Sequence, residues 1–194
     1  MTFIREIPIM MRARSTFAVL TAAFLSMTLS APLAAQAPTT GWRGEFLSQM
    51  NGIEGKFTQL ANAMPWDKYS WRPGKGVRSV CEVFLHIAGD NYSLAEPLGP
   101  KIPAGIDLKT IETCPDSKEK VLATMKAGFA FIRSAAIATP DGDADAMVDF
   151  FGRKITKRAL LLAIAEHAGE HLGQSIAYAR MNGVVPPWSM APAK

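Results

Sequence analysis

The sequence has few of the residues that most often bind metal ions, with only three histidines and two cysteines in 194 residues. It also lacks a strong excess of charge, since the formal net charge is +4. Residues 1–37 hold three arginines and one glutamate, so residues 38–194 carry 18 basic and 16 acidic side chains. This small excess, spread along the chain, is too weak for a nucleic-acid-binding surface, and we expect no nucleic-acid partner.

Long apolar runs are also scarce, and beyond the N-terminal region we expect no segment that is long and apolar enough to cross a bilayer. Near the N-terminus, two arginines precede an uncharged run from Ser15 to Ala31, and small residues follow it up to Ala35-Gln36-Ala37. This arrangement is typical of a secretory signal peptide, so we interpret residues 1–37 as one, cleaved near 35–37. We expect residues 38–194 to be exported to the periplasm or secreted, without integral membrane association. The alternative is a membrane anchor that is not cleaved.

In four stretches after the signal, apolar residues recur at every third or fourth position, which is typical of helices. Ser79 and Glu82 have the spacing of a capping box at the start of the second stretch, and Thr156 is placed to cap the fourth. No stretch alternates clearly enough to predict a sheet. The sequence therefore predicts an all-α four-helix bundle. The helices are expected at about 42–64, 79–96, 117–136 and 157–182.

The connection between the second and third predicted helices is long, because residues 97–115 contain four prolines and two glycines. Nineteen residues can span the roughly 30 Å length of a twenty-residue helix. These two helices can therefore run in the same direction, which predicts an up-down-down-up bundle with a long crossover. Cys81 and Cys114 would then lie near the same end, and we predict a disulfide between them in an oxidising compartment.

All three histidines lie in the middle portions of two predicted helices. His167 and His171 are four residues apart, so they project from one face of the last helix. Leu160 and Ile164 share that face, which therefore points into the bundle. His86 lies just over one turn into the second helix, at the edge of its apolar arc. Three neutral imidazoles would bind one divalent ion, such as Zn²⁺ or Ni²⁺, and leave a fourth position for water or substrate.

Two acidic residues are candidates for moving a proton or orienting a ligand. Asp90 lies one turn beyond His86, and its alternative interpretation is a solvated carboxylate at the rim. Glu170 lies about 80–100° around the helix from the direction of His167 and His171. Residues 167–171 also fit the H-x-x-E-H pattern of inverzincin proteases. Those enzymes take a further glutamate ligand downstream, and no acidic residue follows His171.

Two further blocks of the sequence are informative together. The first contains Trp71-Arg72-Pro73, Ser79-Val80 and His86-Ile87-Ala88, and the second runs from His167 to Gln174 and is followed by Tyr178-Ala179-Arg180 and residues 183–187. In this order, the two blocks resemble the DinB family of four-helix metalloproteins. The resemblance implies an up-down-down-up bundle, often dimeric. It also implies a metal ion bound by one histidine of the second helix and two of the fourth, at the positions of His86, His167 and His171.

The family resemblance further implies kinship with transferases and isomerases that activate a low-molecular-weight thiol. Such thiols are mainly cytoplasmic, which conflicts with the predicted export. We therefore predict a metal-dependent hydrolase, or a transferase of thiols or small electrophiles, acting on a small-molecule substrate. The alternatives are a metal-binding protein without enzymatic activity and a helical interaction protein without a metal.

Overall fold

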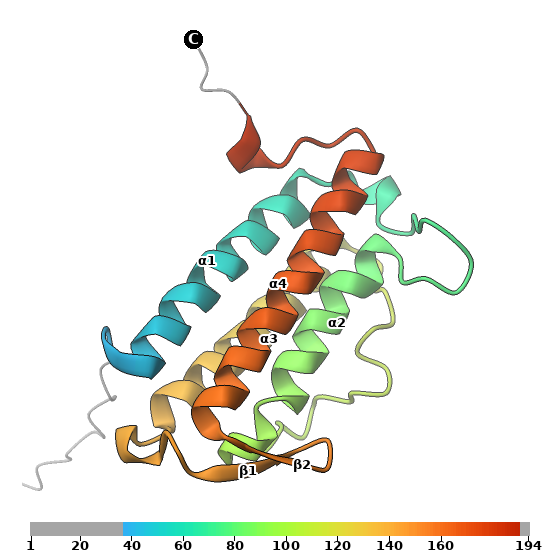
Figure 1. The fold of residues 1–194 in the computed structure, drawn as a ribbon. Helices are drawn as coiled ribbons and strands as arrows, with labels where there is room; N and C mark the ends of the chain where they lie inside the picture. The colour runs from blue at the N-terminus through green and yellow to red at the C-terminus, as the bar shows by residue number, and fades with distance from the viewer. Residues whose placement is uncertain (1–36, 191–194) are drawn as a thin grey trace, which may run out of the picture. The chain divides into compact units, whose positions relative to one another are not determined.

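The computed structural model describes residues 37–190 of the chain. Four long helices pack as a bundle, as predicted (Figure 1). They are α1 (Gly41–Ala63), α2 (Val80–Ser93), α3 (Lys118–Ala138) and α4 (Lys157–Met181). Residues 1–36, which hold nearly all of the predicted signal peptide, lie outside the described residues.

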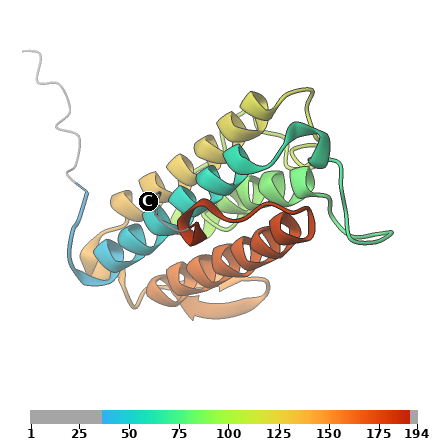
Figure 2. The ribbon, with the colours of Figure 1, turned by 90° about the horizontal axis from the view of Figure 1, so that it is seen from above.

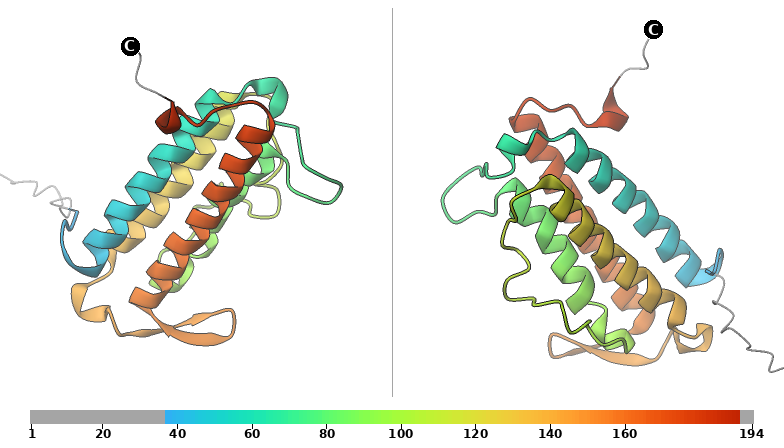
Figure 3. Two further views of the ribbon diagram at one scale, coloured as in Figure 1. Left: turned by 45° about the horizontal axis from the view of Figure 1, so that its top comes forward. Right: turned by 180° about the vertical axis from the view of Figure 1, so that it is seen from behind.

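The helices run up-down-down-up, which confirms the predicted topology. At the start of α3, Lys118 Nζ donates a hydrogen bond of 2.6 Å to the carbonyl of Met64, just beyond the end of α1. Cys81, in the first turn of α2, is bonded to Cys114, shortly before α3, so α2 and α3 begin at the same end of the bundle. The crossover between α2 and α3 therefore returns along the length of the bundle (Figure 3).

The order of the helices around the bundle places α2 next to α4. α1 contacts α3 and α4, and α2 contacts the same two helices, so α1 and α2 lie on one diagonal (Figure 2). α2 and α4 run in opposite directions, and their facing sides carry all three histidines. This adjacency is the feature of the fold that brings together residues far apart in the sequence.

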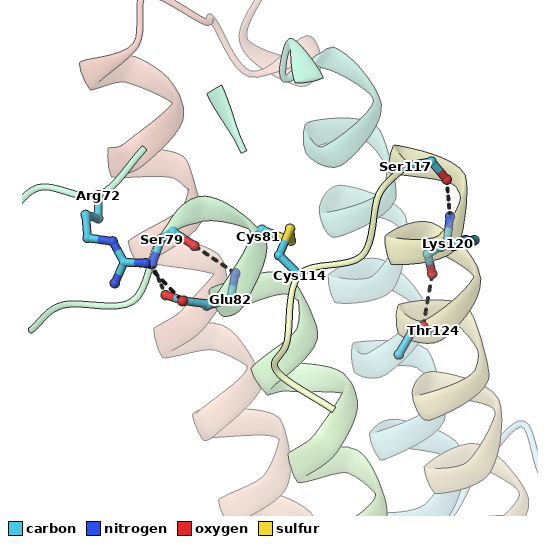
Figure 4. The surroundings of a disulfide bond; sticks show 8 residues. All are labelled: Arg72, Ser79, Cys81, Glu82, Cys114, Ser117, Lys120 and Thr124. Carbon is cyan, nitrogen blue, oxygen red and sulfur yellow. Dashed lines mark hydrogen bonds and ion pairs between the residues drawn. A yellow bond between two sulfur atoms is a disulfide. The ribbon is translucent and has the colours of Figure 1, made fainter. Parts of the chain in front are cut away.

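The start of α2 is fixed by the predicted capping box. The Ser79 hydroxyl accepts a 3.2 Å hydrogen bond from the N–H of Glu82, and the Glu82 carboxylate accepts a 2.6 Å bond from the N–H of Ser79 (Figure 4). Each side chain thus covers a backbone donor that the first helical turn leaves free. Arg72 also contacts the Glu82 carboxylate, at 2.9 Å. Ser117 and Thr156 cap α3 and α4 in the same way, with hydroxyls that accept from backbone N–H groups.

The core lies between the four helices and is rich in aromatic side chains. Phe57 of α1 contacts Phe84 of α2 and Phe129 of α3, with ring centroids 6.3 and 5.9 Å apart. α2 and α3 approach closely at Gly128, where a Cβ atom would lie 2.7 Å from the Ala88 carbonyl oxygen. Glycine at this position therefore sets how closely α2 packs against α3.

The expectation that the chain forms no sheet was wrong. β1 (Met147–Phe150) and β2 (Arg153–Thr156) form an antiparallel hairpin directly before α4, and the two ends of the pairing are Met147 with Thr156 and Phe150 with Arg153. Residues Phe151 and Gly152 form the turn, and both have positive φ angles, 53° and 78°. Strands of four residues are too short for alternation to give a clear signal in the sequence.

A second expectation also needs correction, because α3 is long and apolar enough, by length and composition, to cross a membrane. The apolar periodicity of α3 nevertheless serves the bundle. Val121, Met125, Phe129 and Ile132 are all buried in the core. A core helix and a membrane-spanning helix satisfy the same test of length and composition.

Candidate metal centre

The three histidines meet where α2 faces α4. The ring centroid of His171 lies 4.5 Å from that of His86 and 4.6 Å from that of His167. The rings of His86 and His167 are 5.7 Å apart. The structure thus brings together all three histidines of the sequence, which come from two helices about 80 residues apart in the chain.

Asp90 completes this cluster from α2. Its Oδ2 atom lies 3.1 Å from Nε2 of His86, one turn earlier on the same helix, and 2.5 Å from Nε2 of His167 on α4. The Asp90 side chain is only 25% exposed. Asp90 therefore faces the histidines and is not the solvated rim carboxylate of the alternative interpretation. Each of the four residues offers one ligand atom within 4.8 Å of the others.

The spacing of these donors fits one metal ion. Zn²⁺ binds imidazole nitrogen and carboxylate oxygen at about 2.0–2.2 Å, so two donors of a tetrahedral site lie about 3.3–3.6 Å apart. The 3.1 Å separation from Asp90 to His86 lies just below this range, whereas the 2.5 Å separation from Asp90 to His167 is shorter because the two groups share a proton. A hydrogen bond now joins His167 and Asp90, and an ion between them would replace that proton. Imidazole and carboxylate donors suit Zn²⁺, Ni²⁺ and similar divalent ions.

The electrostatics of the cluster lower the pKa of two of its members, Asp90 and His171. Burial by itself would raise the pKa of Asp90, but the hydrogen bond to His167 and the nearby histidine charges outweigh it and hold the pKa below its usual value. Burial lowers the pKa of His171, and the neighbouring His86 and His167 add to this effect against the opposing hydrogen bond to Gln174. A carboxylate and a neutral imidazole are the forms that bind a metal ion.

The outer nitrogens of two histidines are hydrogen-bonded, which orients both rings. Nδ1 of His171 donates to Oε1 of Gln174 at 2.8 Å, and Nε2 of Gln174 donates in turn to the Tyr178 hydroxyl at 3.0 Å. Nδ1 of His86 donates to Oε1 of Glu112, also at 2.8 Å. Such partners fix the tautomer of a ligating histidine and turn its other nitrogen toward the metal.

Glu112 was missed by the sequence-based prediction. It belongs to the crossover between α2 and α3, where no helical periodicity relates it to His86, 26 residues earlier. Arg78, just before α2, contacts both oxygens of its carboxylate, at 2.7 and 3.1 Å. Burial alone would raise the pKa of Glu112, but the hydrogen bonds from Arg78 and His86 lower it, so the group is held as a carboxylate.

Glu170, the second candidate for proton transfer, lies on the outer side of the cluster. Its carboxylate is 3.9 Å from Nδ1 of His167, and its side chain is 69% exposed. This position agrees with the angular offset expected from its place on α4. Of the two acidic candidates, the structure brings Asp90 into the group of four ligand atoms and leaves Glu170 outside it.

Comparison with known proteins agrees with this fold. The model of the DinB family matches residues 36–194. The chain belongs to the DinB family. Two solved DinB-like proteins share its fold, although at 20% and 21% sequence identity they carry no more specific information. The one from Bacillus cereus has a TM-score of 0.63 and the match covers 73% of this chain and 93% of the other. The one from Bacillus subtilis has a TM-score of 0.59, with 77% and 99% covered.

No curated protein matches the sequence. The family membership accounts for the four-helix bundle, and the cluster between α2 and α4 is the part of the structure with an evident chemical capacity.

Proposed function

We propose that this DinB-family protein binds one divalent metal ion through His86, His167 and His171 and uses it to hydrolyse a small-molecule substrate. The observation that carries the proposal is the convergence of four ligand atoms within 4.8 Å of one another on two adjacent helices. Buried or half-buried imidazoles and carboxylates of this density are costly unless they are hydrogen-bonded or bound to a cation. One divalent cation bound by the three histidines would satisfy their nitrogens and balance the charge of the nearby Asp90 carboxylate.

Each residue has a distinct task in this proposal. The three histidines hold the ion, which supplies a Lewis acid that lowers the pKa of a nucleophile such as water. Asp90 lies beside His86 and His167 and accepts a proton from the attacking nucleophile. Glu170 is exposed at the outer edge, where a shuttled proton can pass to solvent.

Water is favoured over a thiol as the nucleophile. The structure joins Cys81 to Cys114 by a disulfide, and disulfides persist mainly in oxidising compartments. The apolar N-terminal run, followed by an A-x-A sequence, gives independent support for export to such a compartment. Low-molecular-weight thiols are scarce as reduced cosubstrates there. We therefore propose a periplasmic or secreted hydrolase, and mass spectrometry of the mature N-terminus tests cleavage near residues 35–37.

A structural metal site is the second candidate, and the position of Asp90 favours it. If Asp90 is itself a ligand, three nitrogens and one oxygen fill a tetrahedral site and leave no position for water. Closed sites of this kind stabilise folds, whereas catalytic zinc sites keep one position open. The two functions therefore differ in whether the bound ion exchanges water.

Elemental analysis tests the proposal most directly. The protein is purified without a nickel column and compared with the double variant His86→Ala/His167→Ala. We expect about one ion per chain in the wild type and almost none in the double variant, because two of three nitrogen ligands are lost. Glu166→Ala is the matched control, since this exposed residue lies beside His167 on α4. Circular dichroism verifies that the variants are folded.

Two outcomes separate the candidates. If the wild type is metal-free and takes up no added zinc, nickel or manganese, the metal centre is refuted and a helical interaction protein remains. If one ion is bound but exchanges no water, and a screen of small esters, lactones and amides shows no metal-dependent hydrolysis, the structural site is favoured over the hydrolase.

A further inference from the structure

The crossover between α2 and α3 supplies a residue to the histidine cluster. Glu112 accepts the 2.8 Å hydrogen bond from Nδ1 of His86, on the side of the ring away from Asp90. Its charge is balanced by Arg78, which contacts both carboxylate oxygens. The Glu112 carboxylate thus lies between Arg78 and the imidazole of His86. No sequence pattern relates Glu112 to His86.

Two contacts, one on each side of Glu112 in the sequence, hold this part of the crossover against α2. Cys114, two residues after Glu112, is bonded to Cys81, which lies five residues before His86 on α2 (Figure 4). Ile111, just before Glu112, packs on Gly89, where a Cβ atom would lie 2.9 Å from its Cγ2 atom. The disulfide is the one covalent link among these contacts. Glu112 is therefore fixed from both sides along the chain.

A carboxylate on the outer nitrogen of a ligating histidine has a known physical effect. It fixes the proton on Nδ1, so that Nε2 carries the free electron pair, and it makes that nitrogen a stronger donor. Nε2 of His86 is the atom that faces Asp90 in the cluster. The hydrogen bond from His171 goes instead to the neutral amide of Gln174, so His86 receives the stronger support of the two.

We propose that Glu112 is a positioning residue of the metal centre, and that the Cys81–Cys114 disulfide holds it on His86, so that metal affinity depends on this disulfide. The inference rests on the proposed metal binding. It adds a residue outside the ligand set and gives the disulfide a role at the site, in addition to its effect on stability.

Titration with Co²⁺, followed by its visible d–d absorption, measures both the affinity and the geometry of the site. Glu112→Ala is expected to weaken Co²⁺ binding about tenfold to a hundredfold and to alter the absorption bands, because the His86 ring is no longer oriented. Glu112→Gln keeps an oxygen that can accept from Nδ1, and it should recover much of the lost affinity. Glu119→Ala, an exposed glutamate in the first turn of α3, is the control and should bind as the wild type does.

The role of the disulfide is tested by a double-mutant cycle. Cys81→Ser/Cys114→Ser should weaken Co²⁺ binding in the wild-type background and have little further effect in the Glu112→Ala background, because both changes remove the same contact. In case the serine variant does not fold, a second variant carries two glycines inserted between Thr113 and Cys114. It keeps the disulfide but lengthens its link to Glu112, and the same loss of affinity is expected.

The outcomes distinguish this inference from the proposed function. A wild-type protein that binds no Co²⁺ overturns the metal centre itself. Wild-type binding with an unchanged affinity and spectrum in Glu112→Ala overturns the positioning role of Glu112 alone. Equal losses of affinity from disulfide removal in both backgrounds, or full affinity in the glycine-insertion variant, overturn the tether.

Discussion

Oδ2 of Asp90 lies 2.5 Å from Nε2 of His167, although the two residues are 77 positions apart and on different helices. This contact joins α2 to α4 by polar groups, whereas most of the buried residues of the bundle are apolar. A hydrogen bond between a carboxylate and an imidazole is stronger than a neutral one, but it also keeps two ionisable groups away from water. A metal ion bound between them, as proposed, would compensate for this loss of hydration.

Replacement of Asp90 by asparagine shows whether Asp90 is a metal ligand or a proton acceptor beside the metal ion. If the three histidines hold the ion, Asp90→Asn should keep about one ion per chain, with an affinity lowered roughly tenfold by loss of the nearby charge. Calorimetric titration with Zn²⁺ measures both quantities. Asp67→Asn, at a carboxylate that is 72% exposed, is the control for the same chemical change. Complete loss of the ion would instead show that Asp90 is a required fourth ligand.

Much of the fold and the inner part of the site could be predicted because both follow from helical periodicity. The spacing of His167 and His171, and of His86 and Asp90, places each pair on one helix face without knowledge of the tertiary structure. The crossover length predicted the direction of α3, and with it the meeting of Cys81 and Cys114.

The contact of Glu112 and the β-hairpin were missed because neither follows from helical periodicity. Glu112 reaches His86 from an irregular connection, so only the packing of that connection on α2 reveals the contact. The hairpin turn holds Phe151 and Gly152 at positive φ, where a tight turn commonly has asparagine before glycine. Phenylalanine at this position gives no turn signal, and a strand of four residues such as Met147–Phe150 gives a weak one.

Removal of the disulfide should destabilise the fold substantially. The bond links residues 33 positions apart, so in the chain-entropy model its loss costs about 3–4 kcal/mol by freeing the unfolded chain. For a domain of this size Cys81→Ser/Cys114→Ser should therefore melt roughly 10 °C below the wild type. Thermal melts of both proteins, in metal chelator to exclude an effect of the ion, measure the difference. Equal melting temperatures would mean that the two cysteines are unpaired in the purified protein.

The N-cap side chain of α2 should contribute more to the free energy of unfolding than the N-cap side chain of α1. Ser79→Ala removes the hydroxyl that accepts from Glu82 N–H, and we expect a loss of about 1 kcal/mol in the free energy of unfolding. Thr40, the N-cap of α1, makes no side-chain capping bond in the part of the chain that the structure describes. Thr40→Ala should therefore cost only a few tenths of a kcal/mol. Urea unfolding of the two variants gives the comparison, and similar losses would contradict the assigned cap.

Gly128→Ala and Gly52→Ala, both in helices, should change the free energy of unfolding in opposite directions. At Gly128 the added Cβ would lie 2.7 Å from the carbonyl oxygen and 2.8 Å from the Cα atom of Ala88. These are backbone atoms of α2, so the strain cannot be relieved by a side-chain rotation. Relief requires that α2 and α3 move apart, and Gly128→Ala should destabilise the protein by about 1–3 kcal/mol despite the better helix propensity of alanine.

Gly52 in α1 provides the matched control, because a Cβ atom there would point into open space among the described residues. Alanine lowers the conformational entropy of the unfolded chain at no steric cost, so Gly52→Ala should stabilise the protein by up to about 1 kcal/mol. Urea unfolding of both variants measures the two signs. If Gly128→Ala were also stabilising, α2 and α3 would have to be farther apart than described. α2 also carries His86 and Asp90 on its side toward α4, so a different position of α2 would change their distances to His167 and His171. This stability measurement therefore also tests the geometry of the candidate metal centre.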